Sequence, residues 1–282
     1  MKIRKMFAAV TAVAVLLTGC GGVDTAEVEA LLSQAQETMA TVDSMAAEMT
    51  MEMDMGMNGE IMETTTVASI RSQQNPMKMA MEMSMLMHDG TEVDQMEMYA
   101  AEEDGHLHTY MHMADAWYAE TLELGELNQY NAEENTALYL DNITDVKSAE
   151  KEEVNGTEAT KISGVIKGDA MEKALADSGM TASAESMGIT AEMLEEIYAE
   201  LADLPVSLWI DAEGYVLKYE LDMTEMMQKV MDASIEALGA AGTGMDIEKT
   251  MITMVCSDFN AVEVEIPAEA YGVPMGEHVH AE

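Results

Sequence analysis

Two runs, Met49-Thr-Met-Glu-Met-Asp-Met-Gly-Met57 and Met77-Lys-Met-Ala-Met-Glu-Met-Ser-Met-Leu-Met87, place methionine at every second position. Successive side chains of a β-strand point to opposite faces, whereas a helix would scatter these thioethers around its whole circumference. Each run therefore predicts a strand with one methionine face and one mostly polar face. Asn58-Gly59 follows the first run and favours a two-residue hairpin turn, because both turn positions need positive φ. The two runs together predict an antiparallel meander.

Composition limits the classes of protein that the chain can belong to. Its 282 residues, 48% of them hydrophobic, are enough for one large domain or two small ones. The chain has 13 basic and 54 acidic residues, and its net charge is −41. Phosphate binding needs clustered Lys and Arg, so nucleic acid is not expected as a partner. The acidity is typical of a solvated surface, and it also suits a protein outside the cell or one that meets divalent cations.

The N-terminal residues predict where the protein works. Three basic residues among the first five precede an apolar run from Met6 to Leu17. That run is shorter than the roughly 20 residues that span a bilayer, so residues 1–19 are expected to be a signal peptide. It ends in Leu17-Thr18-Gly19-Cys20, which resembles the bacterial lipobox. The resemblance implies diacylglycerol on Cys20, a lipidated tether over 20–24, and an extracytoplasmic bacterial protein anchored to the cell membrane. An ordinary signal peptide with an incidental cysteine is the alternative.

The rest of the chain alternates further strands with helices. In residues 25–42, Val28, Leu31, Leu32 and Ala35 form a helical stripe that needs a surface to cover, and the strands that follow are the obvious one. The other expected helices are 125–140, 168–176, 191–204 and 224–238, with a loop at 177–190. The other expected strands are 59–71, 92–101, 106–113, a short piece after Trp117, 143–151, 157–166, 205–211, 215–221 and a final strand or strand pair over 249–266. The two strand-rich halves suggest one continuous curved sheet, within a single domain over 25–270 and before a disordered tail at 271–282.

The order of these features resembles the LolA/LppX-like superfamily of bacterial lipoproteins. The resemblance rests on the lipobox, the long meander, and the segments Leu204-Pro-Val-Ser-Leu-Trp-Ile-Asp-Ala-Glu-Gly-Tyr-Val-Leu-Lys218 and Cys256-Ser-Asp-Phe-Asn-Ala-Val-Glu-Val-Glu-Ile-Pro267. It implies an α+β fold, with a large curved antiparallel sheet (a half-barrel) whose concave face is covered by helices. It also implies that a lipid or lipoprotein ligand is held between sheet and helices. The methionine content and the extreme acidity depart from the family pattern.

The methionine runs have three interpretations. An unbranched thioether adapts its shape, so it can line a cavity for variable lipid tails. It can equally fill a closed core, as in a structural or sensory surface lipoprotein without a ligand. Thioethers also bind Cu(I), which would make this a methionine-rich metal-binding protein. The ligand-cavity hypothesis names Met51, Met53, Met55, Met81, Met83 and Met85.

The sequence predicts no cofactor, no tight metal site and no enzyme activity. Successive methionines on one strand face lie roughly 7 Å apart, which is far for two sulfurs to meet one ion. In residues 106–113 the three histidines are expected on one face and Met111 and Met113 on the other. His278 and His280 make only a nonspecific pair. The chain lacks the nucleophile-elbow, zincin and phosphate-loop motifs, and Ser148-Ala-Glu-Lys151 is expected in a strand without its companion motifs.

Overall fold

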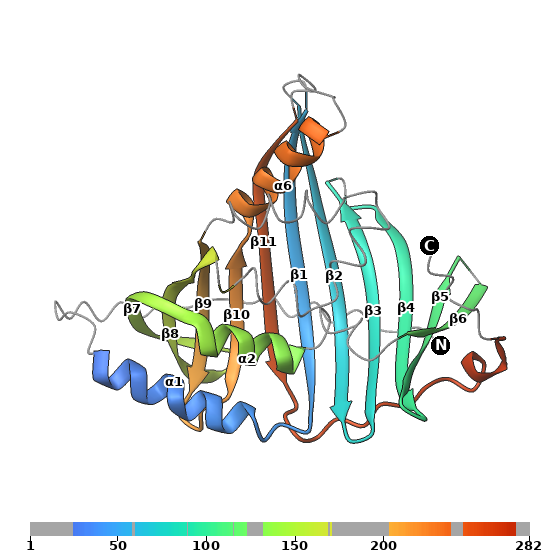
Figure 1. Ribbon diagram of the computed structural model, residues 1–282, viewed down its shortest axis with the longest axis horizontal. Coiled ribbons are helices and arrows are strands. Elements are labelled where there is room, and N and C mark those ends of the chain that lie inside the picture. The colour runs from blue at the N-terminus through green and yellow to red at the C-terminus, as the bar shows by residue number, and fades with distance from the viewer. Residues whose placement is uncertain are drawn as a thin grey trace.

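The computed structural model describes residues 25–57, 60–88, 90–114, 116–122, 132–168, 170, 203–237 and 245–274. Within them, eleven strands form one sheet in the order β6-β5-β4-β3-β2-β1-β11-β10-β9-β8-β7, and each pair is antiparallel. The strands are β1 (Ser44–Met57), β2 (Glu60–Gln74), β3 (Met77–Met87), β4 (Glu92–Glu103), β5 (His106–Met113), β6 (Ala116–Leu122), β7 (Ile143–Val154), β8 (Thr157–Ile166), β9 (Leu204–Asp211), β10 (Val216–Asp222) and β11 (Met245–Ser257). The continuous curved sheet expected from the sequence is confirmed (Figure 1).

The helices α1 (Thr25–Met39), α2 (Ala132–Asn142) and α6 (Thr224–Ala237) lie over one face of this sheet (Figure 1). The stripe of α1 is buried as expected, with Val28 and Ala35 in the same apolar cluster as Leu208 of β9. Tyr139 of α2 meets Tyr219 of β10 edge-to-face, with ring centroids 5.0 Å apart. The α+β fold with helices over the sheet is therefore confirmed, and we call the covered side the helix face.

The third helix, α6, is tied to β11 where the pairing of β1 and β11 is irregular. The register shifts between Asp54 and Met55. Close to this shift, the backbone N–H of Thr250 donates to Thr224 Oγ1 and that of Ile247 donates to Gln228 Oε1. Side chains of α6 thus satisfy strand amides, which fixes the helix along this end of β11.

The turns follow the residues that predicted them. Asp104-Gly105 and Asn155-Gly156 both have positive φ at the two positions, as a two-residue hairpin with the preferred twist requires. Met57 pairs with Glu60, so two residues connect β1 to β2. Asn58 and Gly59 themselves lie outside the described residues.

The segment after β11 differs from the expectation of a strand over 249–266. Strand β11 ends at Ser257, and positive φ at Asp258 and Asn260 turns the chain away from the sheet. We call residues 258–274 the strap; from Val262 on, the strap lies against the other face of the sheet. There the N–H groups of Val262 and Val264 donate to Ser44 Oγ and Gln73 Oε1. The strap ends in the 3-10 helix η2 (Ala270–Gly272), beside β6 in Figure 1.

Other sequence predictions are altered or lie outside the described residues. The acidic helix is seen as α2 from residue 132, while 123–131 lie outside that part of the chain. Most of 168–204 also lies outside it, and Leu204 opens β9 where the sequence predicted a helix end. The expected tail at 271–282 begins within η2, and 275–282 are outside the described residues. None of the described helices is long and apolar enough to cross a membrane.

Candidate functional site: the methionine face

The strand register gathers the methionines onto the helix face of the sheet. Met49 pairs with Met254 of β11, whose neighbours on that face pack against α1 and α2. Since residues directly opposite each other share a face, pairing carries this face from β1 to β5. We call it the methionine face; its methionines are Met45, Met49, Met51, Met53 and Met55 of β1, Met62 of β2, Met77, Met79, Met81, Met83, Met85 and Met87 of β3, Met96 and Met98 of β4, Met111 and Met113 of β5, and Met254 of β11.

The structure places all six of the predicted cavity residues on this face but in two environments. Met81 is 1% exposed and belongs to the main apolar cluster, against which Met83 also packs. The other four are partly buried and do not belong to that cluster among the described residues; we call Met51, Met53, Met55 and Met85 the outer methionines. One part of the face is therefore core, and the other part is not.

Strand β2 separates the two methionine runs. Ala68 lies between Met49 and Met83, and Thr66 lies between Met51 and Met85. These β2 side chains are shorter than the thioethers on either side. Met51 of β1 and Met85 of β3 thus stand two strands apart, roughly 10 Å, across the smaller Thr66, whereas Met55 pairs with Met62 of β2.

Simple alternation does not hold along the whole of β4. It would place Val93 on the same face as Glu97 and Tyr99. The register of β3 and β4 shifts between Met83 and Met85, so Val93 pairs with Met85 on the methionine face. A bulge adds one residue to one strand and moves every side chain beyond it to the other face.

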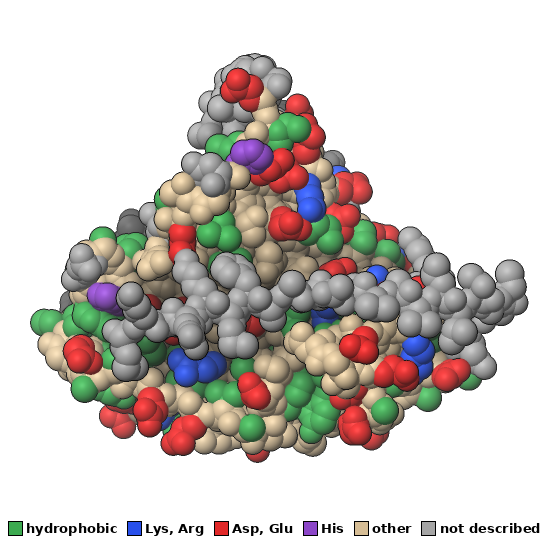
Figure 2. Space-filling model, turned by 180° about the vertical axis from the view of Figure 1, so that it is seen from behind, with side chains coloured by type: hydrophobic (Ala, Val, Ile, Leu, Met, Phe, Trp, Pro, Cys, Tyr) green, Lys and Arg blue, Asp and Glu red, His purple; other side chains and the backbone are tan. Residues whose placement is uncertain are grey.

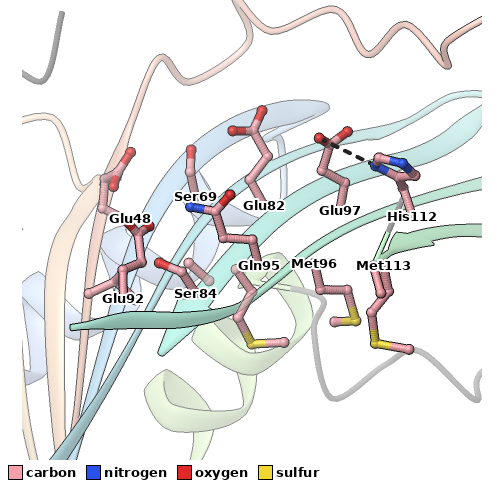
Figure 3. A pocket seen from close by; sticks show the side chains of 14 residues that line it. Glu48, Ser69, Glu82, Ser84, Glu92, Gln95, Met96, Glu97, His112 and Met113 are labelled. Carbon is pink, nitrogen blue, oxygen red and sulfur yellow. Dashed lines mark ion pairs between the residues drawn. The ribbon is translucent and has the colours of Figure 1, made fainter. Parts of the chain in front are cut away.

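The opposite, polar face carries a hollow that sequence reasoning missed. It encloses about 770 Å³, and its lining includes Glu48 of β1, Glu82 of β3 and Glu97 of β4. In Figure 3 these carboxylates point to one side of the strands, and Met96 and Met113 point to the other. Acidic side chains also stand out over much of this face in the rear view, where Lys and Arg are few (Figure 2). In the sequence, the polar residues that alternate with the methionines are the signal for this hollow. From the sequence alone, we interpret them as solvated surface.

Aromatic residues border this hollow. His112 stacks on Trp117 with ring centroids 4.8 Å apart, and its Nδ1 lies 3.8 Å from Glu97 Oε1. The Tyr99 hydroxyl donates to Glu97 Oε2, and burial, then the negative charge of Glu97, raises the pKa of Tyr99 to about 12. Tyr99 therefore stays neutral and acts as a donor at any ordinary pH. The hollow thus presents carboxylate acceptors, and Tyr99 beside it is a neutral donor to one of them.

The opposed faces expected for residues 106–113 are confirmed. His112 pairs with Glu97 on the polar face, while Met111 and Met113 pair with Met98 and Met96 on the methionine face. Within the described residues, no group of three or more His, Cys, Asp or Glu side chains is arranged to hold a metal ion. Cys20, His278 and His280 lie outside the described residues, so the predictions that involve them stay predictions.

Residues 27–272 match a protein family described as a family of unknown function, DUF6612. The chain belongs to the DUF6612 family. The match contains every described strand, so the methionine face and the polar hollow both lie within the DUF6612 region. No curated protein matches this DUF6612 chain in sequence.

Solved structures similar to this DUF6612 chain include two mycobacterial proteins, one of them a lipoprotein. LppX from Mycobacterium tuberculosis is 14% identical with a TM-score of 0.45, over 84% of this chain and 99% of that one. LprF from Mycobacterium bovis is 11% identical with a TM-score of 0.47, over 89% and 100%. An outer membrane lipoprotein-sorting protein domain from Vibrio parahaemolyticus is 11% identical with a TM-score of 0.26, over 84% and 95%. At these identities and TM-scores the likeness carries no statement about this chain's role or ligand.

Proposed function

We propose that the protein is an extracytoplasmic bacterial lipoprotein that binds a hydrophobic ligand, a lipid or the acyl chain of a lipoprotein, against the methionine face. No enzyme activity is part of the proposal. The observation that carries it is the division of that face. Met81 is buried in the apolar cluster, while the outer methionines are only partly buried and lie outside it.

The chemistry of the outer methionines suits acyl chains. A thioether side chain has three rotatable bonds and a polarizable sulfur, so it can repack around ligands of different shape. Thr64 and Thr66 of β2 are smaller than methionine and leave less side-chain volume beside Met51, Met53 and Met85. The polar face, by contrast, carries the carboxylates, which would repel anionic headgroups and would lose hydration against acyl chains.

Membrane attachment through Cys20 is the second part of the proposal. The lipobox supports it, as does the short distance of four residues from Cys20 to Asp24, directly before α1. A tether of this length holds the sheet close to the bilayer from which a lipid would come. We expect Cys20→Ala to appear in the soluble fraction or as an unprocessed precursor. A processed Cys20→Ala protein that still sediments with membranes would contradict the anchor.

The ligand proposal is tested with two added charges on the outer methionines. Burying an unpaired carboxylate in an apolar environment is costly, but a carboxylate at an open site stays hydrated. We therefore expect Met53→Asp/Met85→Asp to keep its fold and to lose binding of cis-parinaric acid, a fluorescent fatty acid. Thermal unfolding and fluorescence titration of the full chain in detergent measure the two effects separately.

Two further variants make this test decisive. Thr50→Asp/Ser84→Asp puts the same charges on the same strands but on the polar face, and should leave fatty-acid binding unchanged. Met81→Asp should unfold the protein, because that side chain is 1% exposed and such core lesions cost about 3 kcal/mol or more. If Met53→Asp/Met85→Asp unfolds as Met81→Asp does, and the parent protein binds no fatty acid, the face is closed core and the protein is a structural or sensory lipoprotein.

A further inference from the structure

The register places methionines side by side across three neighbouring strands. Met83 of β3 pairs directly with Met96 of β4, and Met96 pairs directly with Met113 of β5. Cβ atoms of directly opposed residues lie about 4.5–5.5 Å apart. These three thioethers therefore form a row across the sheet, which we call the thioether row.

This row changes the geometric case for a soft metal ion. The sequence argument against copper considered only successive methionines along one strand, which lie roughly 7 Å apart. Across the sheet the spacing is shorter, so Met83 and Met113 need to lean only about 3 Å each toward Met96 to bring three sulfurs around one ion. The three rotatable bonds of methionine allow such a lean.

Exposure separates this row from its neighbour. Met81, Met98 and Met111 also pair across β3, β4 and β5, but Met81 is 1% and Met98 5% exposed, within the apolar cluster. In the thioether row, Met113 is 48% exposed and Met83 and Met96 are partly buried. Figure 3 shows Met96 and Met113 pointing the same way, from adjacent strands. Met83 and Met96 pack against the apolar cluster, as Met111 of the neighbouring row does, so the thioether row meets solvent at Met113.

The ligand atoms decide which ion fits. Three neutral thioether sulfurs are soft donors, which favour Cu(I) and disfavour Ca²⁺ or Mg²⁺. The nearby carboxylates Glu82 and Glu97 belong to the opposite face of the same strands, so they cannot supply oxygen ligands to this row. The net charge of −41 nevertheless raises the local concentration of any cation.

We propose that Met83, Met96 and Met113 form a three-thioether site for a monovalent soft ion, Cu(I). The site goes beyond the binding of a hydrophobic ligand. It lies on the methionine face next to the outer methionines but uses none of them, so either function can fail without the other.

The experiment measures Cu(I) affinity by competition with the chelator bicinchoninate, under anaerobic reducing conditions, on the full chain in detergent. We compare the parent protein with Met83→Leu/Met96→Leu/Met113→Leu, which removes the sulfurs and nearly conserves side-chain volume. The matched control is Met51→Leu/Met53→Leu/Met85→Leu. It removes three thioethers from the same face, none of which pairs directly with another methionine.

We expect the parent and the control to bind one Cu(I) more tightly than the row variant, by roughly tenfold or more. Met113→Leu alone should weaken binding too, and this variant avoids any question of folding because Met113 is 48% exposed. X-ray absorption of the copper-loaded parent should show sulfur ligands only. The proposal is overturned if the parent does not compete with the chelator, or if the row variant and the control have the same affinity.

Discussion

Gly214 is the residue at which the turn between β9 and β10 meets α1. Its φ is +91°, and a Cβ built there would lie 2.6 Å from Thr38 Oγ1 and 3.1 Å from the carbonyl oxygen of Gln34. The same turn is bonded to the helix, since Gln34 Nε2 donates to the Ala212 carbonyl and Thr38 Oγ1 to the Glu213 carbonyl. Only glycine satisfies both the backbone angle and the close approach, so this residue sets the distance between helix and sheet.

We expect Gly214→Ala to lower the free energy of unfolding by about 2–5 kcal/mol, the sum of left-handed backbone strain and a steric clash. The matched control is Gly156→Ala, where φ is +85° but nothing lies within 4 Å of the added Cβ. Its cost should be the strain alone, about 1–2 kcal/mol. Urea unfolding measures both. Equal losses in the two variants would show that α1 moves away freely and that the contact fixes nothing.

Asp211 lies in the segment on which the sequence resemblance to the LolA/LppX-like superfamily rests. It is 7% exposed, and its Oδ1 accepts hydrogen bonds from the backbone N–H groups of Glu213 and Tyr215. The sequence predicted the turn from Glu213-Gly214. It gave no sign that the carboxylate would organise the turn backbone, because that role depends on the side chain folding back over its own loop.

At the scale of elements, the strap is the part of the fold that sequence patterning misread. Val262, Val264 and Ile266 alternate with acidic residues or proline as a strand would. The contrary signal was the pair Asp258 and Asn260, residue types that tolerate positive φ. The Asn260 N–H donates to the Ser44 carbonyl, and its Oδ1 accepts from Asp43 N–H, both at 2.7 Å. An alternating apolar and polar pattern predicts that one face of a segment is buried. It does not show whether the backbone of that segment pairs with a neighbouring strand.

We expect Asn260→Ala to release the strap, because the variant loses the hydrogen bond from Asp43 and strains the backbone at φ +57°. The free energy of unfolding should fall by about 2 kcal/mol. Amide hydrogen exchange should speed up at Val262 and Val264, whose N–H groups are held by Ser44 and Gln73. Asn260→Asp keeps an acceptor and serves as the control. Unchanged exchange at both amides in Asn260→Ala would show that the strap is held by its apolar contacts alone.

Strand pairing explains how far the candidate site could be predicted. A period of two assigned the methionines of β1 and β3 to one face each, and the structure confirms that the two faces are the same side of the sheet. The two-residue period of a strand does not determine which residues of neighbouring strands pair with each other. That Met83 lies beside Met96 depends on the turn after Met87 and on the bulge that follows, and neither is visible in alternation. The sequence therefore could not predict that Met83, Met96 and Met113 lie side by side, although it placed each of them in a strand.

At the scale of the whole molecule, charge opposes the compact state. The chain has a net charge of −41, and its acidic residues outnumber its basic ones about four to one. Several lysines are paired, as Lys167 is with Asp145 and Asp203 at 2.6 and 2.9 Å, but most carboxylates have no cation to meet. Their mutual repulsion is greater when the chain is compact than when it is unfolded.

We therefore expect the unfolding temperature to rise as NaCl increases from about 0.01 to 0.3 M, because the Debye length falls from roughly 30 Å to below 8 Å. A gain of about 1 kcal/mol corresponds to about 3 °C for a chain of this size. KCl at the same ionic strength should act alike, since screening does not depend on the identity of the ion. An unfolding temperature that stays level or falls would mean that local ion pairs outweigh the overall repulsion.

The position of β11 has a consequence for the order in which the protein is made. Strands β1 to β6 and strands β7 to β10 are two local meanders, and β11, the last strand to be synthesised, joins them by pairing with β1 on one side and β10 on the other. Ala46 finds its partner only at Ser257. A ribosome-bound chain thus lacks the middle of its own sheet until nearly all of it has emerged, and contacts this distant in sequence form slowly. Such a chain stays open through most of its synthesis and closes its sheet only when β11 pairs.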